Sequence, residues 1–115
     1  MNKILEQGLL YDFYGELLTD HQKNIYEQVV MEDLSISEIA ANQGISRQGV
    51  HDLVKRCGKI LEGYENKLHL VEKFLSIGKN IREIETLLNQ YEEENESNEI
   101  ITKIRILSRE ILDEL

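Results

Sequence analysis

Apolar residues recur every three or four positions along this chain, and no proline interrupts them. This spacing gathers apolar side chains on one face of a helix, whereas a half-buried strand needs alternation at every second residue. Because proline is the strongest helix breaker, its absence leaves long helices uninterrupted. The pattern predicts an all-α fold, and no segment shows convincing strand alternation.

Capping signals divide this pattern into helices. Thr19 followed by Gln22 is a capping-box pattern, in which each side chain bonds the other residue's backbone amide. Ser35 followed by Glu38 repeats it. A break is expected at Ser76-Ile77-Gly78, and the acidic run 92–98 predicts a loop. The expected helices therefore cover 2–17, 20–31, a short segment from 35 to 44, 46–75, the stripe 81–91, and 100–115.

The segment from Leu34 to Val50 is the most informative part of the sequence. Gly44 ends a short helix and is expected at positive φ, and Ser46 is expected to cap the helix that follows. Ala40 is small enough to let the second helix cross closely, and Val50 would lock the two helices together. These features predict a helix-turn-helix, two helices at a steep angle joined by a turn of three to four residues.

The second helix of this motif would expose a row of polar and basic side chains. Arginine and glutamine can pair with base edges, and lysine and arginine suit phosphates. The chain carries a net charge of −9, however, and has no basic tail. The row is therefore either a nucleic-acid contact or a solvated helix face. Its members are Arg47, Gln48, His51, Lys55, Arg56 and Lys59.

The chain resembles known helix-turn-helix proteins in three segments: Leu10–Thr19, Ser37–Ala40 and Gly44–Asp52. Residues 19–61 are similar to the promoter-recognition domain of bacterial sigma factors, which here would lack a wing. Nearly the whole chain resembles the YlxM family of small bacterial helix-turn-helix proteins. That resemblance implies a gene neighbourhood shared with signal recognition particle components, and hence a role in that targeting pathway.

The C-terminal half predicts assembly. We expect a helix-turn-helix domain over 1–64 and a helical extension over 65–115 that forms a homodimer, because its apolar stripes exceed what three short helices can hide. The alternative is a compact monomer in which the stripe packs against Leu9, Phe13 and Leu17. The residues expected at the dimer interface are Leu68, Val71, Leu75, Ile81, Ile84, Leu88, Ile104, Leu107 and Ile111.

No constellation of residues suggests catalysis. His21, His51 and His69 lack metal-binding spacing, Cys57 is the only cysteine, and there is no glycine-rich phosphate loop. We therefore expect a protein that is not an enzyme, with no cofactor, metal or small-molecule substrate. No secretion signal or membrane-spanning run is visible, which favours the cytoplasm.

These observations support one leading hypothesis and two alternatives. The leading hypothesis is a regulatory or accessory protein of the signal recognition particle pathway, which acts through that particle's RNA, its GTPase or the expression of its genes. Its nucleic-acid ligand would be DNA or RNA. The first alternative is a DNA-binding transcription regulator. The second is a protein-binding adaptor that uses its acidic C-terminal helices as the interface.

Overall fold

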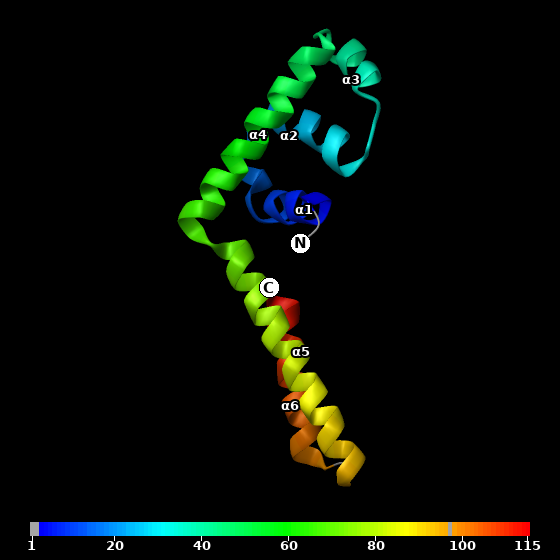
Figure 1. Ribbon diagram of the computed structural model, residues 1–115, viewed down its shortest axis with the longest axis vertical. Coiled ribbons are helices and arrows are strands. Elements are labelled where there is room, and N and C mark those ends of the chain that lie inside the picture. The colour runs from blue at the N-terminus through cyan, green and yellow to red at the C-terminus, as the bar shows by residue number, and fades with distance from the viewer. Residues whose placement is uncertain (1–2, 97) are drawn as a thin grey trace. The chain divides into compact units, whose positions relative to one another are not determined.

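The computed structural model describes residues 3–96 and 98–115, and these residues form helices without any strand, which confirms the all-α fold. The starting residue of the expected helix 2–17 and Ser97 of the expected loop lie outside the described residues. No helix in the described part of the chain is long and apolar enough to cross a bilayer. The elements in chain order are α1 (Lys3–Tyr14), the 3₁₀ turn η1 (Gly15–Leu17), α2 (Asp20–Tyr26), the π-helical turn η2 (Glu27–Met31), α3 (Ile36–Gln43), α4 (Arg47–Leu68), α5 (Leu70–Glu94) and α6 (Glu99–Glu114) (Figure 1).

The chain divides into two compact units, Met1–Val71 and Glu72–Leu115. The division falls after Val71 rather than after Tyr64, where the sequence placed the domain boundary. A buried tyrosine explains the difference. Tyr14 donates its hydroxyl to the Glu65 carboxylate at 2.5 Å and accepts the Leu70 amide at 3.2 Å, and the same carboxylate accepts the Val71 amide at 2.9 Å. These bonds tie the start of α5 to the first unit.

The predicted helix break at Ser76-Ile77-Gly78 was wrong. The break lies earlier, at His69, whose backbone is left-handed with φ 56° and whose amide donates to the Glu65 carbonyl. Helix α5 then continues through Gly78, because an interior glycine costs a helix only about 1 kcal/mol relative to alanine. The expected helix 46–75 is thus two helices.

The core of the first unit forms where α1, α2 and α3 pack on α4. One cluster joins α1 and α2 to the middle of α4, and a second joins α2 and α3 to its beginning. The predicted capping box at the start of α2 is present, with Gln22 N–H donating to Thr19 Oγ1 at 3.2 Å and Gln22 Oε1 accepting from Thr19 N–H at 3.0 Å. Fully buried side chains of the two clusters include Tyr14, Tyr26, Ile25, Ile39, Val50, Cys57 and Leu61.

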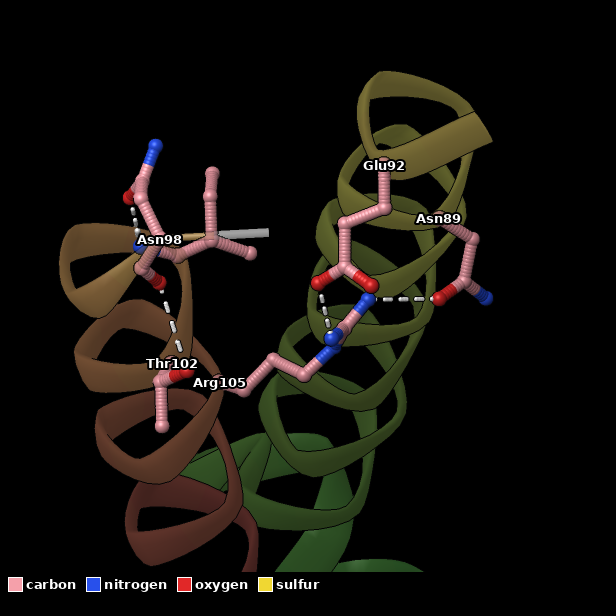
Figure 2. Close-up of polar contacts among 6 residues, drawn as sticks. Asn89, Glu92, Asn98, Thr102 and Arg105 are labelled. Carbon is pink, nitrogen blue, oxygen red and sulfur yellow. Dashed lines mark hydrogen bonds and ion pairs between the residues drawn. The ribbon is translucent and has the colours of Figure 1, made fainter. Parts of the chain in front are cut away.

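The second unit is an antiparallel hairpin of α5 and α6. Arg105 reaches from α6 to two side chains of α5, pairing with Glu92 and donating to Asn89 Oδ1 at 2.7 Å (Figure 2). At the start of α6, Asn98 Oδ1 accepts the Ile101 amide at 3.0 Å, which caps the helix. Among the described residues of the second unit, the buried side chains are those of Ile81, Leu88, Ile101 and Ser108.

Candidate nucleic-acid interface

The turn between α3 and α4 has the predicted geometry. Gly44 lies at φ 68°, ψ 29°, in the left-handed region that glycine adopts without a Cβ penalty. Its amide donates to the Ala41 carbonyl at 3.4 Å, and the Ile45 amide donates to the Ala40 carbonyl at 3.1 Å. This pair of bonds is a Schellman motif, which satisfies the last carbonyls of α3 and reverses the chain. The helix-turn-helix predicted from the sequence is therefore confirmed (Figure 1).

The two serines expected as helix caps behave differently. Ser46 Oγ accepts the Gly49 amide at 2.9 Å and caps α4 as predicted. Ser35 stands at the start of α3, but its side chain makes no capping bond, so that prediction was wrong. Both serines have an extended backbone, with ψ 131° at Ser35 and 160° at Ser46, but only the Ser46 hydroxyl accepts a first-turn amide.

The position of α4 is set by the buried side chains behind it. Val50 is fully buried against Ile39 and Ala40 of α3 and against Ile25 of α2. Cys57 lies about two helical turns beyond Val50 and is fully buried against α1 and α2. Because these residues fix one side of α4, the opposite side is held outward as a rigid helical surface.

All six polar residues predicted for that surface are exposed, between Arg47 and Lys59 of α4. Three of them, Lys55, Arg56 and Lys59, come together with Asp52 around a shallow hollow of about 260 Å³. Gln48 Nε2 donates to Asp52 Oδ1 at 2.9 Å, one turn along the same face. Arg47 and His51 stand nearer the start of the helix and are exposed without lining the hollow.

The charge of this surface is opposite to that of the whole chain. Between Arg47 and Lys59 the helix carries four basic residues and one acidic residue, while the chain has a net charge of −9. Asp52 is the acidic member, and its bond to Gln48 occupies one of its oxygens. We refer to Arg47, Gln48, His51, Lys55, Arg56 and Lys59 as the basic face of α4.

The predicted dimer residues fall into two groups. Val71, Ile81 and Leu88 are buried within the chain itself. The other six are exposed: Leu68, Leu75, Ile84, Ile104, Leu107 and Ile111. Other exposed apolar side chains stand three or four residues from a predicted member, namely Leu87, Tyr91, Ile100 and Leu115.

Comparison with known proteins agrees with this geometry. Residues 1–101 match the family model UPF0122, the YlxM/p13-like helix-turn-helix proteins. The chain belongs to the UPF0122 family. A UPF0122 protein of Desulforamulus reducens is 41% identical over 113 residues, 98% of this chain and 96% of the relative. One of Thermoanaerobacter sp. is 42% identical over 103 residues, 90% of this chain and 88% of the relative.

A third UPF0122 relative shows higher identity over a shorter stretch. The protein of Caldanaerobacter subterraneus is 51% identical over 76 residues, 66% of this chain and 65% of the relative. The names of these relatives state neither a ligand nor a reaction. For this UPF0122 protein, the basic face is therefore the feature from which we infer a function.

Proposed function

We propose that this protein binds nucleic acid through the basic face of α4, as a cytoplasmic regulatory or accessory protein rather than an enzyme. One observation carries the proposal. A helix-turn-helix with an ordered turn presents four exposed cations between Arg47 and Lys59 of its second helix, in a chain that is otherwise strongly acidic. Cations gathered on one helix face form the kind of basic patch that binds nucleic-acid phosphates.

The residues of the basic face divide into two roles. In helix-turn-helix complexes the first residues of the second helix contact base edges in the major groove. Arg47 and Gln48 stand there, and their side chains are the types that pair with guanine and adenine. Lys55, Arg56 and Lys59 stand about two to three turns further on and suit phosphate oxygens. The phosphate contacts would supply most of the affinity and make it depend on salt.

The pathway we propose is that of the signal recognition particle. The support is the resemblance to the YlxM family, which implies a shared gene neighbourhood with components of that particle. The direct ligand would then be the particle's RNA. A duplex DNA operator is the alternative, favoured by the outward placement of Arg47 and Gln48 on a helix of the type that enters the major groove.

We also propose that the second unit joins two copies of the chain. With about 3.6 residues per helical turn, Ile84, Leu87 and Tyr91 lie on one side of α5. The antiparallel arrangement places this side next to the exposed stripe of α6. Folded units near 40 residues usually need such support, because they bury too little surface of their own. This shared apolar side, here named the hairpin face, consists of Ile84, Leu87, Tyr91, Ile100, Ile104, Leu107 and Ile111, all exposed.

Light scattering tests this assembly. Two hairpins packed face to face would form a four-helix bundle, so we expect a particle of twice the 13.4 kDa chain mass. Leu107→Glu should return it to the monomer mass. Ile106→Glu is the matched control, because Ile106 is 52% exposed, close to the 58% of Leu107, and lies off the hairpin face, about 100° around α6 from Leu107. A wild-type monomer at micromolar concentration, or equal effects of the two variants, would refute the dimer.

Fluorescence anisotropy with labelled probes tests nucleic-acid binding. The probes are a mixed-sequence DNA duplex and the RNA of the signal recognition particle, each titrated at several salt concentrations. Arg56→Ala combined with Lys59→Ala should weaken binding and reduce the salt slope by about 2, roughly one for each lost phosphate contact. Lys79→Ala with Arg82→Ala is the matched control. Both side chains are exposed on α5, and the two substitutions remove the same charge as the α4 variant does.

The outcomes separate the hypotheses. Tighter binding of the RNA supports the particle pathway, and tighter binding of the duplex supports a transcription regulator. An unchanged salt slope in the α4 variant removes the basic face from consideration. Absence of binding to either probe at low salt contradicts the proposal and favours a protein-binding adaptor.

A further inference from the structure

The first unit carries an apolar groove that the basic face does not use. It consists of two adjoining hollows of about 300 and 490 Å³ between the start of α1 and the turn η2. Ile4, Val30 and Met31 line both of them. Leu5 and Leu9 complete the first hollow, and no residue of the basic face lines either one.

The apolar side chains of this groove are open to solvent. Ile4 is 69% exposed, Leu5 62% and Met31 46%. Scattered exposed apolar residues are ordinary on proteins, but several lining one hollow mark a surface that a partner covers. The groove thus differs from the packed side of α1, where Leu10 and Tyr14 are buried.

One wall of the groove is a π-helical turn. The Glu32 amide donates to the Glu27 carbonyl, five residues back, at 2.9 Å, and this widened turn carries Val30 and Met31. Such turns are rare and are frequently found at functional sites. Glu27 also accepts the hydroxyl of Tyr11, which ties η2 to α1 and holds the two walls together.

The charges around the groove have one sign. Asp12 lines the first hollow and Asp33 the second, and among the described residues neither hollow is lined by lysine or arginine. Glu6 and Glu32 are exposed beside the lining residues. Lys3, at the start of α1, is the one basic residue of that helix. A ligand whose apolar side chains fill the hollows would therefore meet carboxylates at the rim.

We propose that this groove binds an amphipathic helix of another protein, with an apolar stripe flanked by lysine or arginine. Anchors one turn apart on a helix are about 5–6 Å from one another, so successive anchors can enter two adjoining hollows. Basic flanks would face Asp12 and Asp33. A second copy of this chain is the alternative occupant, and loss of self-association in the apolar variant described below would reveal it.

Two synthetic helical peptides test the charge argument. They share one leucine stripe, flanked by lysine in the first and by glutamate in the second, and each is titrated into the isotope-labelled full chain by NMR. The lysine peptide should shift the amides of Ile4–Asp12 and Val29–Asp33, and the glutamate peptide should not. Asp12→Asn with Asp33→Asn should weaken binding of the lysine peptide. Asparagine is chosen because it adopts the left-handed backbone that Asp33 has, with φ 53°, so the substitution changes charge without straining the turn.

A second pair of variants tests the apolar contact. Leu5→Gln with Met31→Gln should weaken the lysine peptide by roughly tenfold or more, since both changes remove apolar surface that the peptide would cover. Ile106→Gln is the control, an exposed apolar residue on α6, and should leave affinity unchanged. The proposal is overturned if the glutamate peptide binds as well, if the control weakens binding equally, or if the Leu5 and Met31 variant instead abolishes self-association of the chain.

Discussion

Substitution of Gly44 isolates the backbone strain of the helix-turn-helix. A Cβ added at this position would meet no atom within 4 Å, so only the left-handed φ of 68° opposes a side chain. That strain costs about 1–2 kcal/mol for an ordinary residue. We expect Gly44→Ala to destabilise the fold by about 1 kcal/mol and Gly44→Val by about 2, since β-branched residues tolerate positive φ least. Gly44→Asn should cost least, because asparagine visits this region.

Urea unfolding followed by tyrosine fluorescence measures these differences. The chain has no tryptophan, and four of its five tyrosines, Tyr11, Tyr14, Tyr26 and Tyr64, lie in the first unit, so the signal reports the unit that contains Gly44. The midpoint should fall in the order asparagine, alanine, valine, with an unchanged slope.

Gly58 provides the matched control for this series. It lies inside α4 without positive φ, and a Cβ there would also meet no atom within 4 Å. Gly58→Ala should therefore stabilise the chain by about 0.5–1 kcal/mol, through reduced freedom of the unfolded chain and better helix propensity. If both alanine variants shift the midpoint in the same direction, or if Gly44→Val leaves it unmoved, the strain argument is refuted.

Other predictions concern the first unit. Gly15→Ala should lower the free energy of unfolding by about 1–3 kcal/mol, because the added Cβ would lie 2.8 Å from the ring of Tyr11. That ring is held in place by stacking on Tyr26 and by a hydrogen bond to Glu27. Gly8→Ala is the control and should not destabilise the chain, because the space around Gly8 is open. Tyr14→Phe should cost about 1–3 kcal/mol in the same assay, because it removes the hydroxyl that bonds Glu65; an unchanged midpoint would exclude this bond as a stabilising contact. Burial, and then bonding to a carboxylate, raises the pKa of Tyr11 and of Tyr14 above the usual value of about 10. Above about pH 10 these two tyrosines therefore stay protonated in the folded chain while they lose their protons in the unfolded chain. The free energy of unfolding should be constant with respect to these groups below about pH 10 and should fall as the pH rises further. Urea midpoints that do not fall above about pH 10 would contradict this.

The sequence predicted those parts of the fold that local rules decide. The capping box at Thr19, the left-handed Gly44 and the cap at Ser46 each depend on residues within a few positions, and all three are present. The break at His69 was not predictable in this way. The His69 amide donates its hydrogen bond to Glu65 within α4. The Glu65 side chain, however, also accepts a hydrogen bond from Tyr14, which is 51 residues away in sequence.

The candidate sites were predictable to different degrees. All residues of the basic face are exposed as expected, because the burial of Val50 and Cys57 fixes which side of α4 faces the core. In the hairpin, α6 carries two adjacent apolar stripes, and periodicity alone cannot decide which one faces α5. Ile101 is buried and Leu107 is exposed. The groove had no local signal either, because residues 27–31 continue the helical pattern of α2 and their π-helical turn depends on packing.

An NMR titration of the isotope-labelled chain with the tighter-binding of the two nucleic-acid probes tests the central claim most directly. At 13.4 kDa the chain suits residue-level amide mapping, whether alone or as a dimer. We expect chemical-shift changes concentrated between Ser46 and Lys59, at the turn and the basic face of α4, and we expect them to fade as salt is added. Shifts confined to α5 and α6, or none at low salt, would contradict it.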